Sequence, residues 1–154
     1  MLIAGGTVFA LDLLSKWLVV EWMDLGHLGR IDVLPPYLNF VMAWNRGINF
    51  GIGAGGPELM RWILILLALA ISVALVLWVR RRGARDEGIE RAPALAWGAG
   101  IIIGGALGNA WDRVWYGAVA DFLNMSCCGF ANPYAFNIAD VAIFAGAALI
   151  ALKA

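Results

Sequence analysis

Two aspartates in the second half of the chain have the residue type and setting to activate a water molecule. Asp121 lies in the apolar sequence VADF, and Asp140 ends the sequence FNIAD. Two carboxylates held close together in a low-dielectric site share one proton, because both cannot easily ionise. The ionised partner can take a proton from water while the protonated partner donates to the carbonyl under attack. This is aspartic peptidase chemistry, and it needs no metal, cofactor or covalent intermediate.

Other catalytic groups are scarce in this chain. The only histidine, His27, is interpreted as a surface residue, and no serine lies in a nucleophile motif. Cys127 and Cys128 are adjacent, a spacing that suits neither a disulfide framework nor a metal site. We therefore expect no metal and no cofactor.

Further polar residues lie within otherwise apolar segments. Asp12 and Lys16 are four residues apart on one helical face and can pair. They are either a buried ion pair that orients the first helix or residues that contact the substrate and tune a catalytic group. Ionisable groups inside a membrane cost about 2.5–3.5 kcal/mol at the helix centre and are usually functional, so both interpretations stay open.

A second polar group closes the third apolar segment. Asn109, Asp112 and Arg113 share one helical face. Asn109 and Arg113 are predicted to hold the site. Asp112 either belongs to the site too or, in an interpretation of equal weight, extends with Arg113 to the lipid headgroups.

Two other polar positions have structural alternatives. Asn137 could cap the last helix, with Asp140 at the third helical position. The glycine-rich stretch that begins with Asn45, Arg46 and Gly47 is either an ordinary turn or part of the site.

The elements that must position these residues are expected to be transmembrane helices. Hydrophobic residues make up 62% of the 154 residues and charged residues 14%, against about 25% charged in soluble domains. A spanning helix needs about 20 mostly apolar residues. Four segments qualify, within a single four-span membrane domain over residues 1–154: residues 2–20, 59–79, 94–115 and 136–152.

Arginines set the expected orientation. Arg80, Arg81, Arg82, Arg85 and Arg91 lie between the second and third segments, and short basic loops stay cytoplasmic. Both termini are then cytoplasmic, and the loops at about 23–58 and 116–135 face outward. Within the first outer loop, residues 38–44 are predicted to form a strand after Pro35-Pro36, giving a small β-like platform on the membrane surface.

Gly100, Gly104 and Gly108 share one face of the third segment and predict close helix packing. The formal net charge is zero, which gives no reason to expect a nucleic-acid partner. The polar clusters all lie in the outer half of the spans, whereas an ion conductor needs polar groups at several depths. Chemistry at the outer interface is therefore favoured over a small transporter or channel subunit using Asp12 and Lys16, and over a non-catalytic scaffold.

The motifs also occur in a familiar order. They are Asp12-Leu-Leu-Ser-Lys16, Asn45-Arg46-Gly47-x-x-Phe50-Gly51, Gly104-Gly105-Ala106-Leu107-Gly108-Asn109-x-x-Asp112-Arg113, Val119-Ala120-Asp121-Phe122 and Phe136-Asn137-Ile138-Ala139-Asp140. Over essentially the whole chain this sequence closely resembles bacterial lipoprotein signal peptidase, or signal peptidase II. One departure is Ile48-Asn49, where the family usually has two small residues.

The resemblance implies an all-α inner-membrane aspartic endopeptidase that cuts prolipoproteins on the amino side of a diacylglyceryl-modified cysteine. Its catalytic pair would be Asp121 and Asp140, with an active site at the periplasmic face. It also implies that the protein contacts membrane lipids and binds globomycin-type inhibitors, and we expect it to be a monomer. The residues expected to bind substrate or support the site are Asp12, Lys16, Asn45, Arg46, Gly47, Asn109, Asp112, Arg113 and Asn137.

Overall fold

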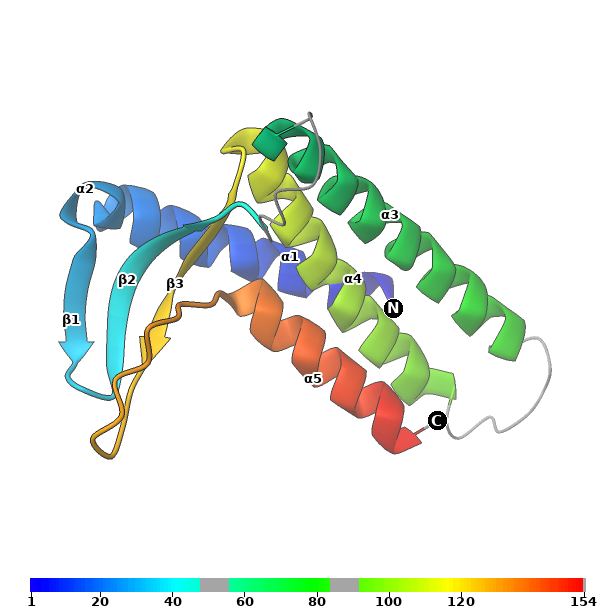
Figure 1. Ribbon diagram of the computed structural model, residues 1–154. Coiled ribbons are helices and arrows are strands. Elements are labelled where there is room, and N and C mark those ends of the chain that lie inside the picture. Colours follow the sequence, from blue (N-terminus) through cyan, green and yellow to red (C-terminus); the bar gives the residue numbers. More distant parts are fainter. Residues whose placement is uncertain (48–55, 84–91, 154) are drawn as a thin grey trace.

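Long apolar helices dominate the chain, and a small antiparallel sheet stands at one end of them (Figure 1). The computed structural model describes residues 1–47, 56–83 and 92–153. Ile48-Asn49, where the sequence departs from the usual family pattern, lies outside these residues. In chain order the elements are α1 (Leu2–Lys16), η1 (Trp17–Trp22), α2 (Leu25–Leu28), β1 (Arg30–Leu34), β2 (Leu38–Asn45), α3 (Gly56–Gly83), α4 (Ala92–Trp115), β3 (Val119–Met125) and α5 (Ile138–Lys153).

Helix α4 lies at the centre of the helices and packs against α1, α3 and α5. Its glycines allow the close approach. A Cβ atom on Gly104 would lie 2.9 Å from the Val8 Cβ and closer still to the Gly5 carbonyl, and one on Gly105 would lie 2.5 Å from the Ala139 carbonyl oxygen. The predicted packing face of Gly100, Gly104 and Gly108 is confirmed, since each of these glycines lies against Met1 or α1, while Gly105 makes a second close contact with α5.

Three of the helices among the described residues are long and apolar enough to cross a membrane: Leu2–Trp22, Glu58–Arg82 and Pro93–Trp115. The first continues past the expected end through a π-helical turn, η1. The fourth helix, α5, has 16 residues, a rise of about 24 Å against a hydrocarbon core of about 30 Å. The fourth span therefore stays a prediction.

The sheet has the order β1-β2-β3, and both strand pairs are antiparallel. The predicted strand at 38–44 is confirmed as β2, the central strand. Strand β3 was not predicted; it comes from the second outer loop, at about 116–135, and pairs Asp121 with Ala43. Phe122 packs under the sheet with Val19 and Leu25, which attaches the sheet to the end of the first helix. The sheet therefore positions Asp121 relative to the helices.

Candidate active site

Asp121 and Asp140 are held by two asparagine amides that also contact each other. The Asn137 Nδ2 donates to Asp121 Oδ1 at 2.7 Å and to Asn109 Oδ1 at 3.0 Å. The Asn109 Nδ2 in turn donates to Asp140 Oδ1 at 2.9 Å. Strand β3, helix α4 and the start of α5 thus bring the two aspartates into one hydrogen-bonded network.

Asn137 has a second role at the start of α5. Its Oδ1 accepts the Asp140 backbone N–H at 2.8 Å, which is the N-cap geometry that the spacing of these residues suggested. The cap uses the oxygen of this side chain and the network uses its nitrogen, so the predicted cap is confirmed and does not exclude a role of Asn137 in the site.

Asn45, at the end of β2, contacts the other oxygen of Asp121. Its Nδ2 donates to Asp121 Oδ2 at 3.1 Å, and its Oδ1 accepts the Gly47 backbone N–H at 2.9 Å. Gly47 has a φ of +88°, and a Cβ there would lie 2.6 Å from a methyl carbon of Leu64, so only glycine suits this turn. Arg46 between them is exposed and makes no hydrogen bond or ion pair with the described residues.

A buried group of three charges lies behind this network, and we call Asp12, Lys16 and Asp112 the lysine cluster. The Lys16 Nζ lies 2.6 Å from Asp12 Oδ2 and 2.7 Å from Asp112 Oδ2, and all three side chains are at most 3% exposed. The pairing of Asp12 with Lys16 predicted from their spacing is confirmed. Asp112 pairs with Lys16 inside the protein, so the alternative in which it extends to the headgroups is wrong.

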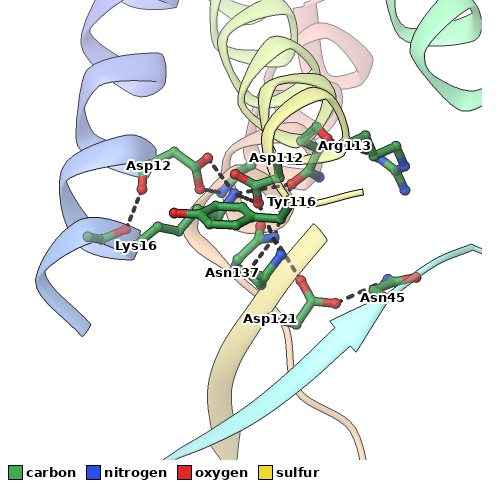
Figure 2. Close-up of polar contacts among 12 residues, drawn as sticks. Asp12, Lys16, Asn45, Asp112, Arg113, Tyr116, Asp121 and Asn137 are labelled. Carbon is green, nitrogen blue, oxygen red and sulfur yellow. Dashed lines mark hydrogen bonds and ion pairs between the residues drawn. The ribbon is translucent and has the colours of Figure 1, made fainter. Parts of the chain in front are cut away.

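The lysine cluster also contacts the backbone beside each aspartate of the pair. Asp12 Oδ1 accepts the Ala139 N–H at 3.0 Å, next to Asp140, and Asp112 Oδ2 accepts the Ala120 N–H at 3.0 Å, next to Asp121. Figure 2 shows Asn137 between this cluster and Asp121, with Asn45 on the far side of Asp121. No sequence pattern indicated these two backbone contacts, because they join residues far apart in the chain.

Arg113 keeps a free donor near the pair. Its Nη1 donates to the Asn109 carbonyl at 3.2 Å, while its Nε is buried and finds no partner in the described parts of the chain. A buried donor without a partner is costly.

The electrostatic setting of Asp121 raises the pKa of its carboxyl group above the ordinary value. The side chain is 3% exposed, and burial raises the pKa of Asp121 to about 6. The hydrogen bonds from Asn45 and Asn137 oppose this change in pKa, and the charge of Asp140 adds to it. A carboxyl group that holds its proton close to neutral pH can donate it to a reacting carbonyl.

His27 and any group that could hold a metal ion are the other features to locate. His27 is exposed and pairs with Asp24, in agreement with its interpretation as a surface residue. Within the described residues, no group of three or more His, Cys, Asp or Glu side chains could hold a metal ion.

The fold is similar to that of bacterial membrane enzymes. Two solved structures of bacterial membrane enzymes, obtained by the in meso method at 2.3 and 1.9 Å resolution, superpose with TM-scores of 0.71 and 0.75. Both are 26% identical to this chain and cover 97% of it, while the chain covers 84% and 88% of theirs.

Sequence relatives define the family. Residues 5–154 match signal peptidase (SPase) II. The lipoprotein signal peptidase of Methylorubrum extorquens (strain PA1) is 43% identical over 145 residues, which is 94% of this chain and 79% of the relative. That of Rhodopseudomonas palustris (strain ATCC BAA-98 / CGA009) is 41% identical over 152 residues, 96% of this chain and 87% of the relative. The chain belongs to the signal peptidase II family of membrane peptidases that process lipoproteins, which confirms the resemblance of the motifs.

Proposed function

We propose that this chain is an aspartic endopeptidase that removes signal peptides from prolipoproteins, cutting on the amino side of a diacylglyceryl-modified cysteine. The observation that carries the proposal is the network in which Asn137 and Asn109 join the carboxylates of Asp121 and Asp140. Membership of the signal peptidase II family supports the same substrate class.

In the proposed reaction the two aspartates share one proton. The ionised carboxylate takes a proton from water, which attacks the scissile carbonyl, and the protonated carboxyl donates to the carbonyl oxygen. When the tetrahedral intermediate collapses, the C–N bond breaks and the leaving amine takes a proton from the pair. Because each proton moves between neighbouring carboxyls and substrate, no metal or cofactor takes part.

We assign the lysine cluster a positioning role. Asp12 holds the peptide N–H that precedes Asp140, Asp112 holds the N–H that precedes Asp121, and Lys16 joins the two acids. The cluster thereby fixes the separation of the two catalytic backbones. A catalytic group misplaced by about 1 Å can lose about a hundredfold in rate, so this support matters for activity as well as for stability.

The remaining polar residues are proposed to receive the substrate. Arg113 offers its free Nε to a backbone carbonyl of the extended peptide. Asn45, oriented by the Gly47 N–H, holds one side of Asp121, and the exposed Arg46 is proposed to contact a lipid headgroup phosphate. These contacts would orient a bond that lies next to the membrane-anchored cysteine.

The proposed setting is the bacterial inner membrane, with both termini cytoplasmic and the sheet at the periplasmic surface. In this topology α5 is the fourth span and the chain forms a single domain that works as a monomer. The scissile bond of a lipid-anchored substrate lies at the membrane surface, where its acyl chains can stay in the bilayer. Cyclic peptides of the globomycin type would occupy the same site.

The proposal is tested with purified protein in detergent and a diacylglyceryl-modified peptide. We expect Asp121→Asn and Asp140→Asn each to lower cleavage by about a thousandfold, while the exposed Asp24→Asn leaves the rate unchanged. The unmodified peptide should be cut poorly. Equal cleavage of the two peptides, or normal activity in either pair variant, would contradict the proposal.

A further inference from the structure

The two adjacent cysteines lie at the tip of a turn that the peptidase reaction does not use. The Phe130 N–H donates to the Cys127 carbonyl at 2.8 Å, which closes the turn. Its two central residues both have positive φ, +57° at Cys128 and +81° at Gly129. This combination is typical of a type I′ turn, in which glycine is ordinary and cysteine is not.

The turn presents both thiols to solvent side by side. Cys127 and Cys128 are free and exposed, and their Sγ atoms lie 2.7 Å apart. Neither thiol contacts Asp121 or Asp140. Of the two cysteines, Cys127 lines a pocket of about 390 Å³, together with Gly129 and Phe130 of the same turn and residues of the β1–β2 hairpin, including Arg30 and Pro36.

We propose that Cys127 and Cys128 are a modification site, at which a reversible disulfide forms between neighbouring residues. In the reaction, one thiolate attacks a low-molecular-weight disulfide such as oxidised glutathione and releases one thiol. The second cysteine then displaces the other thiol. Both cysteine protons are lost, one S–S bond forms in the protein, and the small disulfide is reduced to two thiols.

Chain geometry makes this disulfide easy to reduce. Consecutive Cα atoms across a trans peptide are about 3.8 Å apart, whereas most disulfides join Cα atoms about 4.4–6.8 Å apart. Strained and exposed disulfides are the reducible, regulatory ones. The proposed periplasmic position of the turn places it in a compartment where disulfides form.

The turn lies between the two aspartates along the chain, and hydrogen bonds tie both of its sides together. Asn124 donates to the carbonyls of Asn132 and Tyr134 at 2.8 and 2.9 Å, and the Asn132 N–H donates to the Ser126 Oγ at 3.1 Å. Closing the disulfide therefore reshapes the tip and the pocket wall while these bonds keep β3 and the start of α5 in place.

The test uses the full chain in detergent, reduced and then equilibrated with glutathione buffers of increasing oxidised fraction. Remaining thiols are blocked with N-ethylmaleimide, and intact mass and non-reducing electrophoresis are recorded. Cys127→Ser and Cys128→Ser are the matched controls, because each keeps one thiol in the same turn. Phenylarsine oxide, which binds paired thiols, is titrated against the same three proteins in their reduced form.

We expect the wild-type chain to become a monomer that has lost two hydrogens, takes up no N-ethylmaleimide and recovers both thiols on reduction. In its reduced form the wild-type chain should bind one phenylarsine oxide. Each serine variant should carry one glutathione after oxidation and should bind no phenylarsine oxide when reduced. Three results would overturn the proposal. The wild-type chain could carry a separate glutathione on each cysteine, or it could form a disulfide-linked dimer. Both of its thiols could also still react with N-ethylmaleimide in a buffer that oxidises the serine variants. None of these readouts depends on peptidase activity, so failure here leaves the proposed function untouched.

Discussion

The side chain of Asn137 serves two partners through different atoms, and a substitution can separate these roles. Serine keeps a cap oxygen for the Asp140 N–H but has no amide to donate to Asp121 or Asn109. We expect Asn137→Ser to melt within a few degrees of the wild type while cleavage falls at least tenfold. Asn137→Ala, which also loses the cap, should cost about 1 kcal/mol more. Melting temperature and cleavage rate measured together distinguish the variants, and a serine variant with full activity would contradict the donor role.

The raised pKa of Asp121 predicts a pH-dependent stability. Folding raises this pKa from 3.8 to about 6, so the folded chain holds the proton more tightly than the unfolded chain. The resulting stabilisation is present below pH 3.8 and is lost as the pH rises through about 6. Asp121→Asn lacks this dependence.

We therefore expect the melting temperature of Asp121→Asn relative to the wild type to increase by a few degrees between about pH 4 and about pH 8. Thermal unfolding of both proteins in the same detergent checks this prediction. Taking the difference between the two melting temperatures removes the contribution of other titrating groups, because both proteins contain them. A difference that does not change with pH would show that the folded and unfolded chains hold this proton equally.

Residue spacing predicted the local part of the site but not its long-range part. The Asp12–Lys16 pair and the Asn137 cap each lie within one helical turn, so the sequence distance indicates the contact. The Lys16–Asp112 pair joins α1 to α4, and its geometry depends on how those helices pack. For this reason Asp112 had an alternative at the membrane surface that the structure excludes.

Among the elements, β3 shows most clearly what a sequence pattern leaves out. Its residues are buried on both faces at Val119, Asp121 and Phe122, so the alternation that marks a half-buried strand is missing. Its partner β2 lies more than 70 residues earlier, with Ala43 opposite Asp121. The four long helices were predictable because each one carries its own apolar run, whereas the short helix α2 was not predicted.

Helix packing at α1 and α4 gives a prediction with an internal control. A Cβ at Gly104 would lie 2.9 Å from the Val8 Cβ, so Gly104→Ala should push the helices apart and cost about 1–3 kcal/mol. Gly6 lies on α1 with nothing within 4 Å of its added Cβ, and Gly6→Ala should leave stability unchanged or slightly raised. Thermal melting in detergent checks both, and equal effects would mean that the close approach does not stabilise the fold.

The lysine cluster ties α1 to the start of α5 and to β3 and should behave as a unit. Lys16→Met leaves two buried carboxylates without their cation, at a cost of about 3–5 kcal/mol. Adding Asp12→Asn and Asp112→Asn should recover much of the melting temperature, because amides can still accept the Ala139 and Ala120 N–H groups. If the triple variant melts no higher than Lys16→Met, the loss comes from packing and not from unpaired charge.

At the scale of the whole molecule, the spans and the sheet together place the site at one end of the helices (Figure 1). Composition predicted a membrane protein, and three helices of suitable length and apolarity agree. The fourth helix was expected at 136–152, yet Asn137 caps it and α5 begins at Ile138. The residues that begin α5 thus build the site as well as the helix.

The proposed mechanism requires Asp121 and Asp140 to act as one catalytic unit, and a double-variant comparison measures this most directly. Cleavage of the diacylglyceryl-modified peptide is followed for Asp121→Asn, Asp140→Asn and the variant that carries both. Groups that act as a unit show strongly non-additive losses, so we predict that each single variant loses about a thousandfold and that the double variant loses no more than about tenfold beyond that. Losses that multiply, or a single variant that retains most of the activity, would contradict the paired mechanism.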